Sequence, residues 1–117
     1  MRVLDGDMVL ARVFIGEADM WEHRPLYHAL VERLRREGFA GATVLRGILG
    51  FGARSVLHTS HILDLSGDLP LVVEVVDTDE RIQSLIPILD EMVPSGLVTL
   101  EKVRVLRYGD GKRGAKG

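Results

Sequence analysis

The residues most suited to chemistry gather in one segment, residues 46–62, which reads RGILGFGARSVLHTSHI. Its glycines permit backbone conformations that other residues resist, and they allow main-chain amides to approach a ligand closely. Amides freed in this way, with the side chains of Arg46 and Arg54 nearby, are suited to binding a phosphate group. The same glycines are also consistent with a strand that ends and a loop that begins, so residue types alone leave both interpretations open.

Two histidines in the same segment, His58 and His61, form an H-x-x-H pattern, and imidazole is a ligand for zinc, nickel and copper. Two ligands are too few for a metal site, and a spacing of three residues in an extended loop separates the rings. The chain contains no cysteine, which excludes disulfides, thiolate metal sites and cysteine nucleophiles. We therefore expect no intrinsic metal, unless molecular symmetry gathers several copies of these histidines.

Composition and charge argue against several functional classes. No Ser–His–Asp or comparable set is assembled locally, so we expect a protein that is not an enzyme. The formal charge of −2 argues against nonspecific nucleic-acid binding, and an aromatic content of 5% argues against an RNA-binding sheet. No run approaches the roughly 18 apolar residues of a membrane span, and the N-terminus lacks the apolar core of a secretory signal. We expect a cytoplasmic location without direct membrane insertion.

Four strands are predicted to position the glycine-rich segment. Period-two alternation indicates strands at residues 8–16, 42–49, 71–76 and 103–108. The alternation slips at residues 99–102, so we expect a loop there, immediately before the last strand.

Two helices are predicted between these strands, from apolar residues at helical spacing. The first begins at Pro25, because proline suits the first turn of a helix. The second follows a cap at Asp77 or Thr78. Pro87 lies inside this second helix, so we expect a kink or a short break near Ser84.

The element order β, α, β, β, α, β predicts an α+β protein with the ferredoxin-like fold, an antiparallel sheet with two helices on one face. We expect a single domain over residues 1–108 and a disordered tail over residues 109–117. Every predicted strand is apolar on both alternating faces, so the sheet face that the helices leave open needs a cover. Other copies of the chain are the simplest cover, which predicts an oligomer.

Several motifs, taken in order, resemble the PII signal-transduction proteins over residues 8–108. These are GFG-x-R, LPLVVEVVD, an acid-capped helix and SGLVTLEKVRV. More closely, RVFIGE, PLYHALVERLR, GATVLRGILGFGA, DLPLVVEVVD and GLVTLEKVRVLRYG are similar to an uncharacterised PII-like family of prokaryotes. The resemblance implies a homotrimer that binds adenine nucleotides in clefts between neighbouring subunits. The nucleotide would be gripped by the base of a T-loop, here residues 50–67, and by a short B-loop that ends in a lysine.

The resemblance also implies a set of residues at the base of the T-loop. Gly50, Phe51, Gly52 and Arg54 match its GFGR-type motif. Val76, at the end of the third predicted strand, matches a position whose main chain meets the edge of the adenine ring. These five residues are candidate nucleotide ligands.

Residues 99–102 match the GDGK segment of the B-loop, and they carry Thr99, Glu101 and Lys102. Only the lysine is retained. Two glycines that wrap phosphates are missing and a carboxylate is present, so the resemblance favours AMP, ADP or a cyclic nucleotide over ATP. Arg104, on the last strand, would either neutralise phosphate charge or pair with a surface carboxylate.

The function implied by the resemblance is regulatory. A nucleotide would alter the order of residues 50–67, and a partner protein, such as a membrane transporter or ion channel, would read that change. Two alternatives stay open. One is a metal-handling trimer resembling the divalent-cation tolerance proteins, which would rest on His58 and His61; the other is a structural trimer without a ligand.

Overall fold

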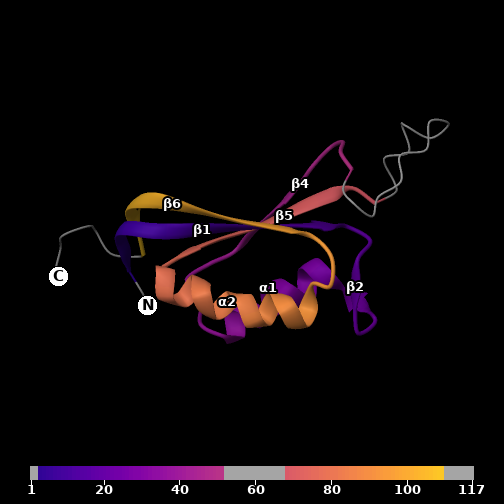
Figure 1. Ribbon diagram of the computed structural model, residues 1–117, viewed down its shortest axis with the longest axis horizontal. Coiled ribbons are helices and arrows are strands. Elements are labelled where there is room, and N and C mark those ends of the chain that lie inside the picture. Colours follow the sequence, from indigo (N-terminus) through magenta and orange to yellow (C-terminus); the bar gives the residue numbers. More distant parts are fainter. Residues whose placement is uncertain (1–2, 52–67, 110–117) are drawn as a thin grey trace.

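The computed structural model describes residues 3–51 and 68–109 of the chain. Within them lie the following elements: β1 (Leu4–Gly16), β2 (Met20–Trp21), β3 (Arg24–Pro25), α1 (Leu26–Arg36), β4 (Thr43–Arg46), β5 (Pro70–Asp77), α2 (Asp79–Met92) and β6 (Leu97–Tyr108). Four strands form an antiparallel sheet in the order β4-β5-β1-β6, and both helices lie on one of its faces (Figure 1). The predicted α+β, ferredoxin-like architecture is confirmed.

Parts of the sequence-based prediction fall outside the described residues. These parts are the predicted tail beyond residue 109 and most of the T-loop-like segment, residues 52–67. The domain boundaries therefore stay predictions. Within the ranges 3–51 and 68–109, neither helix has the length and apolar character that crossing a bilayer requires.

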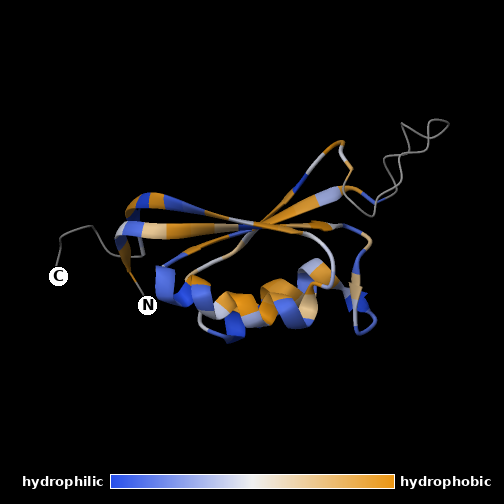
Figure 2. Cartoon of the chain, viewed as in Figure 1, coloured by the Kyte–Doolittle hydropathy of each residue, from blue (hydrophilic) through white to orange (hydrophobic). Residues whose placement is uncertain are grey.

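The core forms because buried apolar side chains alternate along β1 and β5, and the pairing of these strands places them on the same face of the sheet. Antiparallel pairing sets Ala11 opposite Val75 and Val13 opposite Val73, and all four side chains are buried beneath the helices. Alternate residues of a strand point to opposite faces of the sheet, so this register gathers small and branched apolar side chains on one face. Figure 2 shows the resulting apolar layer between the helices and the sheet.

Helix α1 packs on the sheet through Leu26, Leu30 and Leu34, whose spacing of four residues places them on one stripe. Pro25 immediately precedes the helix, where its missing N–H leaves no intrahelical hydrogen bond unmade. Gly38 follows the helix with a φ of +85°, the left-handed conformation in which many helices end. The predicted start of this helix is therefore correct to within one residue.

Helix α2 is capped by Thr78, whose hydroxyl accepts a hydrogen bond of 3.2 Å from a backbone N–H in the first turn. The helix then runs without interruption over Asp79–Met92, so the predicted break near Ser84 is wrong. Pro87 lies on the exposed side of the helix, and the two residues that follow it are buried in the core. Their burial offsets the one backbone hydrogen bond that a mid-helix proline removes.

Three strand boundaries differ from the prediction by more than one residue, and one hairpin was not predicted. β1 begins at Leu4 and β6 at Leu97, earlier than predicted, whereas β4 ends at Arg46. The two longer strands pair with each other, and the added residues extend the ladder of backbone hydrogen bonds between them. The β2–β3 hairpin is absent from the prediction because its turn residues are Glu22 and His23, with φ of 47° and 69°, whereas such turns favour glycine and asparagine.

We expect Leu85→Ala to lower the free energy of unfolding by about 2–5 kcal/mol, because this side chain is 1% exposed and its loss leaves a cavity beneath α2. The adjacent Ile86→Ala is the matched control. Its side chain is 41% exposed, so we expect a loss below about 1 kcal/mol. Urea denaturation followed by circular dichroism measures both variants, and equal losses would contradict this packing of α2.

Candidate functional site

The strand β4 leads into the glycine-rich segment, and the first glycines pack against Pro70 at the start of β5. The backbone N–H of Gly47 donates a hydrogen bond of 2.7 Å to the carbonyl oxygen of Pro70. A Cβ atom would lie 2.8 Å from the Pro70 ring at Gly47 and 3.1 Å from it at Gly50. Close packing therefore favours glycine at position 47 strongly and at position 50 more weakly, whatever else these residues do. Phe51, the next predicted ligand, is 73% exposed.

Four of the residues singled out in the sequence cannot be placed. Gly52, Arg54, His58 and His61 lie outside the described residues. Among the residues that are described, no group of three or more histidine, aspartate or glutamate side chains is arranged to hold a metal ion.

Residues on both sides of the undescribed segment 52–67 form hydrogen bonds or an ion pair with residues at the end of β1. The backbone N–H of Glu17 donates to the carbonyl of Leu69 at 2.8 Å, and that of Ala18 donates to Oδ1 of Asp68 at 2.9 Å. The carboxylate of Glu17 forms an ion pair with the guanidinium of Arg46, the last residue of β4. The two ends of the T-loop-like segment therefore start from one well-defined edge of the protein.

Residues 99–102 belong to β6, so the loop predicted there is wrong. Thr99 pairs with Arg12 and Lys102 pairs with Val9, in a ladder that is regular from Leu97 to Val105. The alternation does not slip, because Thr99 and Glu101 point to one face of the sheet and their neighbours to the other. The connection from α2 to β6 is instead the short stretch at residues 93–96.

The face of the sheet opposite the helices, here called the outer face, carries three predicted ligands: Val76, Thr99 and Glu101. Leu10 lies between Val76 and Glu101 in the register. Apolar side chains make up most of this face, and most of them are partly or largely exposed: Met8, Leu10, Phe14, Leu45, Val72, Val76, Leu97 and Val103.

An ion triad interrupts this apolar surface. Nε of Arg12 donates to Oε2 of Glu74 at 3.0 Å, and its Nη1 donates to Oε1 of Glu101 at 3.3 Å. Neither glutamate is adjacent to Arg12 in sequence; the strands β5 and β6 bring them to either side of it. The carboxylate of Glu101 is therefore engaged by a cation, which weakens its repulsion of an approaching phosphate.

Lys102 and Arg104 lie on the other side of β6, the side that faces the helices, and both are exposed. The segment that contains Gly50 follows β4, at the opposite edge of the sheet from β6. Two strands lie between these edges, which separates them by about 14 Å at least. Among the described residues, a single protomer therefore does not bring Gly50 and Phe51 next to Lys102.

The loop that follows α1 is held by residues to which the sequence assigned no such role. Asp77 is fully buried, and its Oδ2 accepts a hydrogen bond of 2.9 Å from the backbone N–H of Ala40. The hydroxyl of Tyr108 donates to the carbonyl oxygen of the same residue. The guanidinium of Arg81 stacks on the ring of Phe39, 4.5 Å from its centroid. This loop is thereby fixed beside the ends of β5 and β6, next to Val76.

Comparison with known proteins places the chain in a family. Residues 8–105 match the family model DUF190, described as Uncharacterized ACR, COG1993. This chain belongs to the DUF190 family. It is 37% identical over 99 residues to a UPF0166 protein of Aquifex aeolicus (strain VF5), which covers 83% of this chain and 91% of that protein. It is 34% identical over 99 residues to a UPF0166 protein of Methanocaldococcus jannaschii, with coverage of 84% and 91%.

Solved structures show that the DUF190 protein has a PII-like fold. One neighbour is CPII from Thiomonas intermedia K12, solved with ADP and bicarbonate, with a TM-score of 0.63, 16% identity, and coverage of 89% of this chain and 91% of that one. Another is a putative PII-like signalling protein from Thermus thermophilus, with a TM-score of 0.57, 20% identity, and coverage of 91% and 94%. The predicted membership of an uncharacterised PII-like family is confirmed.

We expect Gly96→Ala to destabilise the DUF190 protein by about 1–3 kcal/mol. A Cβ at this position would lie 2.7 Å from the backbone oxygen of Phe14, so the start of β6 would have to move away from β1. Gly41→Ala is the control, because its Cβ would meet the Tyr108 hydroxyl at an ordinary 3.4 Å. Chemical denaturation measures both, and a neutral Gly96→Ala would show that the residues 93–96 connection is not tightly constrained.

Proposed function

We propose that this DUF190 protein is a non-enzymatic cytoplasmic regulator that binds an adenine nucleotide in clefts between the protomers of a homotrimer. The proposal rests on the PII-like fold, which extends over 89% of the chain in the comparison with CPII, a protein solved with ADP. The bound state would be read by a partner, with a membrane transporter or channel as the partner class that we favour.

The distribution of candidate ligands supports a cleft between protomers. Gly50 and Phe51 lie beyond one edge of the sheet and Lys102 lies on the strand at the other edge. Within one chain the edge strands are about 14 Å apart, so the two groups do not converge on a single phosphate there. Two neighbouring protomers would supply one group each.

The outer face supports assembly. Its apolar side chains have no cover within the described part of the chain, because both helices lie on the other side (Figure 1). Antiparallel sheets tolerate one solvated face when that face is polar, but this one is mainly apolar. The Arg12 triad lies among these side chains, and its paired charges would make burial between protomers less costly than unpaired charges would.

The chemistry of β6 supports a nucleotide of limited charge. Lys102 and Arg104 supply two exposed cations. Residues 99–102 are paired in a strand and contain no glycine, so they cannot wrap a phosphate chain with free amides as a glycine-rich loop does. We therefore favour AMP, ADP or a cyclic nucleotide over ATP.

Isothermal titration calorimetry with AMP, ADP, ATP and cyclic AMP tests the ligand. We expect binding of at least one of the first two or the cyclic form, and about tenfold weaker binding in Lys102→Ala, because a charge-assisted phosphate contact is lost. Arg35→Ala, which removes an exposed cation of α1, is the control and should bind normally. Absence of binding by all four nucleotides would contradict the function, whereas unchanged affinity in Lys102→Ala would contradict only the site.

Sedimentation analysis tests the assembly. We expect a mass close to three times 13.0 kDa, and a shift toward monomer in Leu97→Glu, which places a charge on the exposed apolar outer face of an edge strand. Ile86→Glu places the same charge on an exposed apolar position of α2 and should leave the mass unchanged. A monomeric wild-type chain at micromolar concentration would exclude the inter-protomer cleft.

A further inference from the structure

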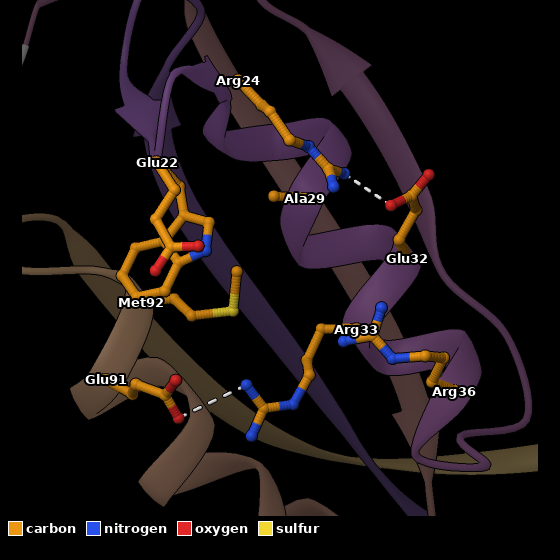
Figure 3. Close-up of a pocket in the computed structure, with 9 residues that line it drawn as sticks. Glu22, Arg24, Ala29, Glu32, Arg33, Arg36, Glu91 and Met92 are labelled. Carbon is orange, nitrogen blue, oxygen red and sulfur yellow. Dashed lines mark hydrogen bonds and ion pairs between the residues drawn. The ribbon is translucent and has the colours of Figure 1, made fainter.

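A cavity of about 240 Å³ lies on the helix side of the molecule, away from the outer face and from β6. It is enclosed by the β2–β3 hairpin, by α1 and by the C-terminal end of α2 (Figure 3). Its apolar lining residues are Trp21 of the hairpin, Ala29 of α1 and Met92 of α2. Neither Trp21 nor Met92 is among the candidate nucleotide-binding residues, so the cavity is separate from the proposed nucleotide site.

Three arginines and three glutamates line the cavity, and two of each are joined in ion pairs. Arg24 pairs with Glu32, and Arg33 donates to Glu91 at 3.3 Å; both pairs are drawn in Figure 3. The hydrogen bond from Arg24 is the main reason that the pKa of Glu32 lies below its ordinary value, so this carboxylate remains ionised and its charge is already balanced.

The remaining two charged side chains are Arg36 and Glu22, one cation and one anion. Neither forms an ion pair with any residue that the structure describes. Arg36 lies close enough to Glu32 to contribute to the lowering of its pKa, but the two make no direct contact. Glu22 comes from the hairpin and Arg36 from the last turn of α1, on different walls of the cavity (Figure 3).

The hairpin presents Glu22 at an energetic cost. Glu22 and His23 occupy the two central positions of the turn with φ of 47° and 69°. Non-glycine residues adopt such angles infrequently, because the side chain crowds the backbone in this conformation. Strained backbone of this kind is concentrated at binding sites, where it fixes the position of a side chain.

We propose that this cavity binds a free α-amino acid with an apolar side chain. The ligand carboxylate would pair with the guanidinium of Arg36, and the ligand ammonium with the carboxylate of Glu22. The apolar side chain would pack against the indole of Trp21 and the thioether of Met92. The inference goes beyond the proposed function, because it concerns a different ligand and a different side of the sheet.

The charge balance distinguishes this ligand from its competitors. A phosphate dianion would meet three carboxylates in the cavity as well as the arginines, so its net attraction is small. A peptide terminus carries only one of the two charges that the cavity leaves unpaired. A free amino acid carries both, next to a side chain of a size that a 240 Å³ cavity accommodates.

The test uses the fluorescence of Trp21, which is the single tryptophan of the chain and therefore reports on this cavity alone. The full-length protein is titrated with L-leucine, L-methionine and L-phenylalanine up to about 10 mM. We expect a saturable change in emission with at least one of them. N-acetyl-leucine and leucinamide each lack one charge of leucine and should bind about tenfold more weakly. Inorganic phosphate at the same concentration should neither bind nor compete.

Variants identify the contacts. Arg36→Gln and Glu22→Gln should each weaken binding about tenfold, and Arg35→Gln, an exposed neighbour outside the cavity, should not. Lys102→Ala should bind the amino acid normally, which separates this site from the nucleotide site. The proposal is overturned if no amino acid changes the emission, if N-acetyl-leucine and leucinamide bind as well as leucine, or if both Gln variants retain wild-type affinity.

Discussion

The register of β1 with its two neighbours is the constraint on which the rest of this structure depends. β1 is an interior strand, paired with β5 on one side and with β6 on the other. Because alternate side chains point to opposite faces, the positions of Ala11 and Val13 beneath the helices leave Leu10 and Arg12 on the outer face. A slip of one residue would bury Arg12 in the core and expose the residues that hold the two layers together.

The same register explains why the candidate ligands fall into separate groups. β4 and β6 are the edge strands, so features that depend on them lie at opposite ends of the sheet. Gly47 and Gly50 satisfy a packing requirement against Pro70, while Glu101 is joined to Arg12 across the outer face. The nucleotide site that we propose therefore depends on how protomers would meet, and the apolar outer face is the surface that we expect to favour such a meeting.

The helix side of the molecule has a different chemical character. The outer face is apolar with one central ion triad, whereas the cavity beneath the β2–β3 hairpin is rich in charged groups of both signs. One layer of the protein thus offers surface for association and the other offers a small polar site. The two sites that we propose share no residue, so occupancy of one would not block the other.

Short-range patterns of apolar residues in the sequence are sufficient to predict the architecture. The alternation in residues 8–16 and 71–76 and the leucine stripe of α1 predict the two main strands and the first helix, because burial of one face imposes a short-range period on the sequence. The polar side chains of Thr99 and Glu101 interrupt the apolar pattern, so the sequence predicts a loop at residues 99–102 where the structure has a regular strand. Pro87 likewise predicts a break that the structure does not have, since packing of the residues beside it outweighs the hydrogen bond that the proline removes from the helix.

The sequence by itself determined the βαββαβ order, the family resemblance and the types of residue available for binding. Only the tertiary structure decided which charges of the described residues are paired with one another. Arg12 meets Glu101 across 89 positions of the chain, and Asp77 meets Ala40 across 37. Glu22 and Arg36 come to share one cavity through a hairpin turn that its residue types do not predict. Periodicity is a local property of a chain, whereas contacts between distant residues exist only once the layers have packed.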